Sequence, residues 1–141
     1  MKHKNLLAGA ALFIVAGLPF TAHADAMRGY TNASVDLLAG PAAAFPPVAH
    51  VASGANVDIM GCTDGFKWCD IGWDGHRGWI DGTYLDSIYK DHHVNIIEYG
   101  SQENVPVVTF EQKTYWDNNY HDQPFYTEQR YWHTTTTTPP Q

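Results

Sequence analysis

Cysteine, positive charge and long apolar segments are all scarce in this sequence. The 2 cysteines among the 141 residues are too far apart for the C-x-x-C motif of thiol oxidoreductases. Lysine and arginine number 8 against 15 aspartates and glutamates, which gives a formal net charge of −7 at pH 7. An acidic chain of this kind is not expected to bind nucleic acid or anionic lipid through charge. No second apolar segment follows the N-terminal one, so no membrane span is predicted after it.

The N-terminal 24 residues have the pattern of a cleaved signal peptide. Two lysines precede an apolar stretch over residues 6–18, and the sequence A-H-A at 22–24 fits an A-x-A cleavage site. We therefore predict cleavage between Ala24 and Asp25, export to the periplasm or secretion, and no membrane anchor afterwards. Loss of the two lysines would take the formal charge from −7 to −9.

The two cysteines are predicted to form a disulfide at the tip of a hairpin. Cys62 and Cys69 flank the turn-like segment T-D-G-F-K-W in a chain expected to be exported, where disulfides persist. If Ile59 faces the core, strict alternation sends Cys62 to the opposite face, whereas Cys69 shares a face with Ile71. A β-bulge near Gly61 would restore the pairing, and we predict one there.

Short apolar runs separated by turn residues dominate the middle of the chain. Clusters of Gly, Pro, Asp, Ser and Asn lie between them, which is typical of short antiparallel strands joined by turns. No stretch after the signal peptide shows a convincing helical period. The runs cover residues 35–38, 57–60, 69–73 and 78–80. We therefore predict an all-β protein.

The order of these pieces resembles the bacterial SH3 (SH3b) domain. The matching segments are D-L-L-A-G-P (36–41), F-P-P-V (45–48), G-A-N-V-D-I (54–59), G-H-R-G-W-I (75–80) and Y-L (84–85). Asp36 stands where the family usually has Asn, and Leu38 stands where it usually has Arg. The resemblance implies a small SH3-like barrel of about five to six short antiparallel strands over residues 30–88, preceded by a flexible N-terminus over 25–29.

Residues 89–133 are interpreted as an aromatic-rich C-terminal extension in extended conformation, and 134–141 as a disordered tail. Residues 105–110 resemble a strand that Pro106 confines to an edge or a strand start. The tail is similar to the Y-W-x-x-x-Y-x-x-x-P-[WF]-Y ending of some exported proteobacterial SH3b proteins. Its rings can pack across the open face of a small barrel or form an exposed platform for a glycan or a peptide. The platform candidates are Tyr115, Trp116, Tyr120, Phe125 and Tyr126.

The resemblance implies a non-catalytic binding module whose partner is peptidoglycan of the cell wall, either its glycan or its peptide. An aromatic groove can stack on sugar faces or hold an extended peptide. Each candidate ring can equally be part of the packing, whereas Trp79 and Leu85 are expected in the core. The groove candidates are Phe45, Phe66, Trp68, Trp73 and Tyr84.

Two alternatives belong to other classes. A protein-interaction module, such as an inhibitor, an immunity protein or a scaffold subunit, would offer its groove or an edge strand to another envelope protein. A histidine-based metal site would use His92 and His93 with Asp91, or His121 with Asp122. Successive residues of a strand point to opposite faces, so the adjacent histidines cannot chelate together in regular β structure.

Enzymatic activity is not expected, and neither is a cofactor. The catalytic domains that accompany SH3b domains in wall hydrolases need about 100 residues or more, whereas only residues 87–141 follow the SH3b-like unit. No serine lies in a recognisable nucleophile elbow, and both cysteines are predicted to be oxidised.

Overall fold

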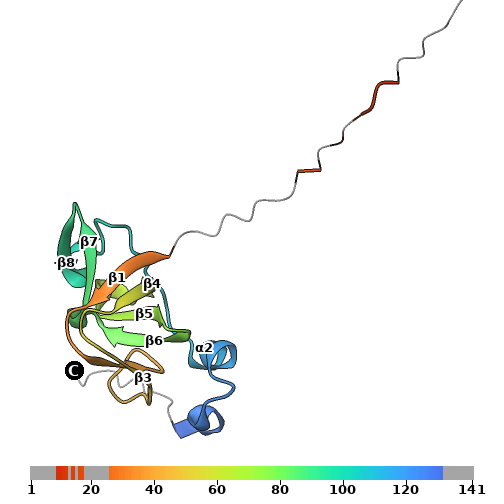
Figure 1. The fold of residues 1–141 in the computed structure, drawn as a ribbon. Helices are drawn as coiled ribbons and strands as arrows, with labels where there is room; N and C mark the ends of the chain where they lie inside the picture. The colour runs from red at the N-terminus through yellow and green to blue at the C-terminus, as the bar shows by residue number, and fades with distance from the viewer. Residues whose placement is uncertain (1–8, 13, 15, 18–25, 132–141) are drawn as a thin grey trace, which may run out of the picture.

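The computed structural model describes residues 9–12, 14, 16–17 and 26–131, and its strands form one antiparallel sheet (Figure 1). The 8 strands lie in the order β3-β2-β6-β5-β4-β1-β7-β8. They are β1 (Met27–Thr31), β2 (Val35–Leu38), β3 (Pro47–Val51), β4 (Asn56–Cys62), β5 (Trp68–Trp73), β6 (His76–Asp81), β7 (Leu85–Tyr89) and β8 (His92–Asn95). The helical elements are the 3-10 helices η1 (Asp64–Phe66), η2 (Gly82–Tyr84) and η3 (Pro124–Tyr131) and the α-helices α1 (Ile96–Tyr99) and α2 (Gln112–Asn119).

The prediction of a mainly β, antiparallel protein is confirmed, but the sheet is not closed into a barrel of five to six strands. Closure would require the two outermost strands to pair, and β3 and β8 lie at opposite ends of the strand order. The added strand β8 comes from the predicted extension. It pairs with β7 through a two-residue turn in which Lys90 and Asp91 have positive φ angles of 49° and 65°. A Lys-Asp turn lacks the glycine by which such a hairpin is normally predicted from a sequence.

The predicted domain limits also differ from the observed elements. Residues 27–29, expected to be a flexible N-terminus, lie in β1 and pair with β4. The limit at residue 88 falls inside β7. The domain therefore starts earlier and extends further than the SH3b-like segments, because β1 and β8 are both parts of one hydrogen-bonded sheet.

The hairpin formed by β4 and β5 contains both the predicted bulge and the predicted disulfide. The pairing register shifts between Ile59 and Gly61, and beyond the shift Cys62 lies opposite Cys69, to which it is disulfide-bonded. Both predictions are confirmed. A β-bulge adds one residue to one strand, and here that residue turns Cys62 to the face that Cys69 occupies.

The predicted strand at 105–110 is reduced to a single parallel bridge between Val107 and Cys62. The Cys62 N–H donates to the Pro106 carbonyl at 2.8 Å, and the Val108 N–H donates to the Cys62 carbonyl at 2.8 Å. This segment crosses directly over Gly61, where an added Cβ would lie 2.6 Å from the Val108 side chain. The absence of a side chain at Gly61 therefore allows the C-terminal segment to approach the bulge.

Two hydrophobic cores are present in the described residues. The first lies within the sheet and includes Leu37, Ile59, Ile71, Leu85 and both cysteines, together with Ile96 and Val105 from the C-terminal segment. The second is aromatic and is built from Ala39, Phe45, Trp116 and Tyr120. Trp79 and Leu85 are 1% and 0% exposed, so their predicted place in the core is confirmed.

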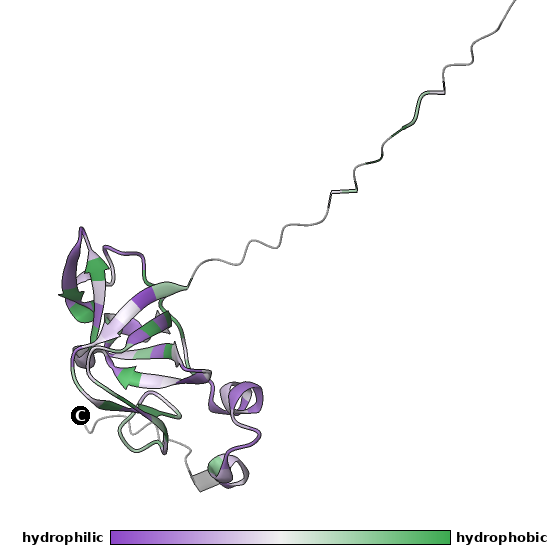
Figure 2. Ribbon diagram, in the orientation of Figure 1, coloured by the Kyte–Doolittle hydropathy of each residue, from purple (hydrophilic) through white to green (hydrophobic). Residues whose placement is uncertain are grey.

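Helix α2 contradicts the expectation that the extension has no helix. The side chain of Glu111 caps its first turn by accepting from the N–H groups of Lys113 and Thr114 at 3.3 and 2.7 Å. Figure 2 shows why α2 was missed: its residues are mostly hydrophilic on a hydropathy scale. Trp116 is nevertheless completely buried. Aromatic contacts of Trp116 and Tyr115, rather than an apolar period, hold this helix on the rest of the protein.

Two of the predictions fall outside the described residues: the cleavage site between Ala24 and Asp25, and the disordered tail at 134–141. In the described part of the chain no helix combines the length and apolar character needed to span a bilayer.

Candidate functional site

Trp68 and Tyr84 are the two predicted groove residues that the structure brings together. They line an open hollow of about 540 Å³, here called the Trp68–Tyr84 groove, with Asp36, Leu38 and Asp81 around them. Trp68 is half-buried, and Tyr84 is 44% exposed. The groove lies where β2, the start of β5 and the end of β6 meet η2. It thus combines two accessible rings with two carboxylates.

Local hydrogen bonds position the ring of Tyr84 at the rim of the groove. Oδ1 of Asp81 accepts from the N–H and the hydroxyl of Thr83 at 2.9 and 2.7 Å, which caps η2. Asp81 also lies directly opposite Trp68 in the β5–β6 ladder. The same carboxylate therefore ties the 3-10 helix that carries Tyr84 to the strand pair that carries Trp68.

The groove has an acidic rim. Asp36 is exposed, and its Oδ1 lies 2.9 Å from Nδ1 of His50. Asp81 uses Oδ1 to cap η2. Carboxylate oxygens accept hydrogen bonds from hydroxyl and ammonium groups, and aromatic faces pack against the C–H faces of sugars or apolar side chains. The arrangement is suited to reversible binding.

Phe45 does not belong to the groove, and the prediction that it would line one is wrong. It is 4% exposed and packs edge-on against Phe110 and Trp116, with ring centroids 5.4 and 6.3 Å apart. An added Cβ on Gly40 would lie 2.6 Å from the Phe45 ring. The ring therefore fills space above a glycine, and the proline pair after it turns the chain into β3 rather than toward solvent.

Phe66 does not line the groove either. It is half-buried and packs against the first core. Its ring would lie 2.7 Å from a Cβ on Gly100, and its carbonyl oxygen would lie 2.0 Å from one on Gly82. Two glycines let η1 pack closely between η2 and α1, which directs the Phe66 ring inward.

Trp73 lies at the other end of β5 and lines a different hollow. It lies five residues along β5 from Trp68, or about 17 Å at 3.3 Å per residue. The predicted groove is therefore divided between two places on the sheet.

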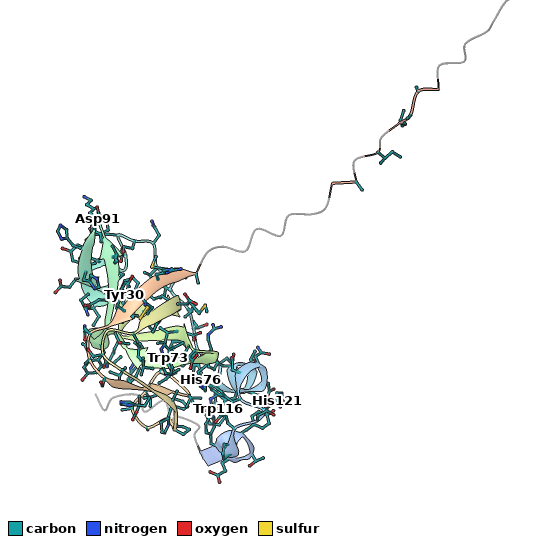
Figure 3. The ribbon with its side chains drawn as sticks, viewed as in Figure 1. Tyr30, Trp73, His76, Asp91, Trp116 and His121 are labelled. Atoms are coloured by element: carbon teal, nitrogen blue, oxygen red, sulfur yellow. A yellow bond between two sulfur atoms is a disulfide. The ribbon has the colours of Figure 1, made fainter. Side chains whose placement is uncertain are left out.

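The C-terminal aromatic residues pack in the second, aromatic core and do not form an exposed platform. Trp116 and Tyr120 are 0% and 2% exposed, and Trp116 lies near the C-terminal helices α2 and η3 (Figure 3). Nε1 of Trp116 donates to the Ala39 carbonyl at 2.8 Å, and the Tyr120 hydroxyl donates to the Arg77 carbonyl at 2.7 Å. The other platform candidates, Tyr115, Phe125 and Tyr126, are half-buried against the same aromatic core.

A partly buried ion pair joins this aromatic segment to the sheet. Arg77 donates to both oxygens of Asp70, at 2.6 and 2.7 Å, and the Tyr115 hydroxyl donates to Asp70 at 2.6 Å. The hydrogen bonds to Asp70 raise the pKa of Arg77. Burial is the main cause that raises the pKa values of Tyr115 and Tyr120 well above 10. Each of these polar groups has a hydrogen-bond partner within the network. The network therefore attaches the C-terminal aromatic segment to the sheet.

The sequence analysis did not identify Asp70 or Arg77 as structural residues. One signal was available: Asp70 is a charged residue between Cys69 and Ile71 in an apolar run, and such a residue is buried only with a partner. The identity of the partner depends on the β5–β6 register and could not be read from spacing alone.

The histidines proposed for a metal site do not converge with other ligands. Within residues 26–131 no group of three or more His, Cys, Asp or Glu side chains is placed to hold a metal ion. The ring of His93 packs on Tyr30 at 4.8 Å, and that of His121 packs on Tyr126 at 4.6 Å. Figure 3 labels Tyr30 and His121, which lie in separate regions of the molecule.

Comparison with known proteins finds no family model that matches this chain and no curated protein of similar sequence.

Proposed function

We propose that this protein is an exported, non-catalytic SH3b-like binding module that holds peptidoglycan in the Trp68–Tyr84 groove. The observation that carries the proposal is the groove itself: two accessible aromatic rings and two carboxylates in one open hollow of about 540 Å³. The resemblance of residues 36–85 to the SH3b pattern supports the same ligand class.

The chemistry of the groove fits the two components of peptidoglycan. A ligand that covers the ring of Tyr84, which is 44% exposed, gains stability because apolar surface leaves water. Sugar rings present C–H faces to aromatic side chains, and peptide stems present amines to carboxylates such as Asp36 and Asp81. Charge attraction to anionic wall polymers has no part in this proposal, since the chain itself carries a formal charge of −7.

Co-sedimentation with purified peptidoglycan tests the proposal. The chain from Asp25 to Gln141 is expected to sediment with it, and the double substitution Trp68→Ala with Tyr84→Ala is expected to weaken binding at least tenfold, equivalent to about 1.4 kcal/mol. Tyr89→Ala is the matched control, because Tyr89 is a half-buried ring that lines neither hollow. Urea unfolding of each variant confirms that it is folded.

Two results would contradict the proposal. One is a wild-type chain that stays in the supernatant at all peptidoglycan concentrations. The other is a double variant that sediments as well as the wild type. Either would direct attention to a protein partner.

A protein-interaction role is favoured by one observation, the free outer edge of β8. This strand ends the described sheet and contains no proline, and Ile88 beside it on β7 is 46% exposed. An exposed edge can accept a strand from another protein. Capture of a stoichiometric envelope protein by the wild type, lost when His93 is replaced by Pro, would support this second candidate, because the His93 N–H points away from β7.

A further inference from the structure

The Trp68–Tyr84 groove carries negative charge without any positive charge to balance it. Among the described residues that line it are Asp36 and Asp81 but no lysine, arginine or histidine, and small or apolar side chains make up most of the rest. A hollow lined in this way attracts cations and repels anions. A neutral sugar is not attracted by this charge, whereas a cationic group is.

The two carboxylates of the groove lie on one face of the sheet. β2 pairs with β6 at Leu38 and Trp79. Asp36 precedes Leu38 by two residues on β2, and Asp81 follows the partner residue by the same step on β6. Because alternate residues of a strand share a face and these strands are antiparallel, the carboxylates occupy matching positions. Like charges across two neighbouring strands destabilise a sheet, and a cation bound between them removes the repulsion.

The aromatic rings of the groove lie next to these carboxylates. Trp68 is directly opposite Asp81 in the β5–β6 ladder, and residues in such a pair share one face of the sheet. Tyr84 lines the same hollow and is 44% exposed. The faces of aromatic rings attract cations, and the indole ring of tryptophan does so most strongly. Two rings beside two carboxylates are the composition of a site for an organic ammonium group.

One oxygen of each carboxylate is available to a ligand. Oδ1 of Asp36 lies 2.9 Å from Nδ1 of His50. Oδ1 of Asp81 accepts from the N–H and the hydroxyl of Thr83. Among the described residues, none donates to Oδ2 of either aspartate. The existing bonds therefore hold both side chains in place and leave an acceptor on each.

From this geometry we propose that the groove recognises the free ammonium group of an uncross-linked peptide stem rather than the glycan. This inference rests on the proposed function and names the part of peptidoglycan that is bound. The ammonium group lies between Asp36 and Asp81 and against the ring of Trp68, and the alkyl chain that carries it packs on Leu38 and Tyr84. An amine that has formed an amide cross-link has lost its charge and keeps one N–H of three, so a cross-linked stem binds weakly.

Titration with two small peptides, followed by calorimetry and by amide NMR shifts, tests the inference. One probe is N-acetyl-L-Ala-γ-D-Glu-L-Lys with a free side-chain amine, and the other is the same peptide with that amine acetylated. We expect the chain from Asp25 to Gln141 to bind the free amine at least tenfold more tightly than the acetylated one. The NMR shifts are expected at Trp68 and Tyr84.

Asparagine substitutions remove the charges of the groove with little change of shape. The double substitution Asp36→Asn with Asp81→Asn is expected to weaken binding of the free-amine peptide at least tenfold, and Asn at position 81 can still cap η2. Asp58→Asn with Asp91→Asn is the matched control, because it changes the net charge equally at two exposed residues that do not line the groove. The control should bind as the wild type does.

N-acetylated peptidoglycan separates this inference from the proposed function. Acetylation blocks the free amines and leaves the glycan and the cross-links in place, and we expect it to weaken sedimentation of the wild type at least tenfold. Equal sedimentation with native and acetylated peptidoglycan, lost in the Trp68→Ala and Tyr84→Ala double variant, would keep the proposed function and overturn the inference.

Three other results would also overturn the inference. The first is a wild-type chain that binds neither peptide at millimolar concentration. The second is equal affinity of the wild type and the Asp36→Asn and Asp81→Asn double variant for the free-amine peptide. The third is binding of that peptide by a chain that sediments with neither form of peptidoglycan, which would assign the ammonium group to a protein partner.

Discussion

At the scale of single residues, Trp79 and Trp116 are buried to the same extent but differ in their polar atom. They are 1% and 0% exposed. Nε1 of Trp116 donates to the Ala39 carbonyl at 2.8 Å, whereas Nε1 of Trp79 has no hydrogen-bond partner among the described residues. A buried donor without a partner lowers stability, so the two indoles contribute differently even though both fill the core.

We expect Trp116→Phe to lower the free energy of unfolding more than Trp79→Phe, by about 1–2 kcal/mol. Both substitutions remove similar volume. The first also takes a donor from the Ala39 carbonyl, while the second removes an unpaired N–H. Urea unfolding of the two variants beside the wild type measures the difference. Equal losses would show that hydrogen bonding at Trp116 contributes nothing beyond packing.

The buried tyrosines predict a loss of stability at high pH. The pKa values of Tyr115 and Tyr120 are raised in the folded protein, chiefly by burial, whereas in the unfolded chain a tyrosine titrates near 10. Their contribution is therefore complete below about pH 10 and is lost as pH rises further, because only the unfolded chain can then release the protons. Each tyrosine adds a slope of about 1.4 kcal/mol per pH unit above that value.

Tyr115→Phe is the variant that tests this pH dependence. It should be less stable than the wild type at pH 7, because it lacks the hydrogen bond to Asp70, and its stability should fall less steeply between pH 10 and 11. Urea unfolding at pH 7, 10 and 11 gives both values. Parallel pH profiles for the two proteins would contradict the prediction.

At the scale of elements, the β4–β5 hairpin is held by both its register and a covalent bond. The bulge between Ile59 and Gly61 aligns Cys62 with Cys69, and β5 continues into an unbroken ladder with β6 from Trp68 to Trp73. The disulfide therefore closes a hairpin whose strands are already positioned by hydrogen bonds on both sides.

Replacing both cysteines by alanine is expected to lower the free energy of unfolding by about 2–3 kcal/mol without changing the sheet, since a short disulfide loop mainly restricts the unfolded chain. Chemical unfolding measures the loss, and amide NMR checks the β4–β5 register. A reductant should shift the wild type by a similar amount and leave the variant unchanged. A wild type insensitive to full reduction would refute the prediction.

At the scale of the whole molecule, the C-terminal segment is part of the fold. Ile96 and Val105 lie in the first core, and Trp116 and Tyr120 lie in the aromatic core. The segment from 89 onward also supplies β8. The sheet thus depends on residues that the SH3b-like pattern does not include.

A chain ending at Asp86 is therefore expected not to fold cooperatively. It would lose β8, α1 and α2 and would expose the face of Trp79 that packs on Phe110 and Tyr115. Thermal unfolding followed by circular dichroism, together with the dispersion of amide NMR signals, measures this. A chain ending at Tyr131 is the matched control and should unfold cooperatively. A sharp transition in the shorter chain would show that the SH3b-like segment is independent.

Local patterns in the sequence determined a large part of this protein. Alternation and turn residues predicted antiparallel strands, the cysteine count predicted the disulfide, and the conflict between Ile59 and Cys62 predicted the bulge. These features depend on neighbours in the chain or across one hairpin, so periodicity and spacing carry the information.

Only the tertiary structure decided which aromatic rings are buried and which remain accessible. Phe45 and Tyr84 have equally suggestive places in the sequence, yet Phe45 is covered by Trp116 of α2 and Tyr84 is left open at η2. Likewise, Arg28, Asp58 and Arg77 line one hollow only because the strand register brings together β1, β4 and β6, which are distant in the chain. Burial and convergence of this kind follow from long-range packing, which no local pattern specifies.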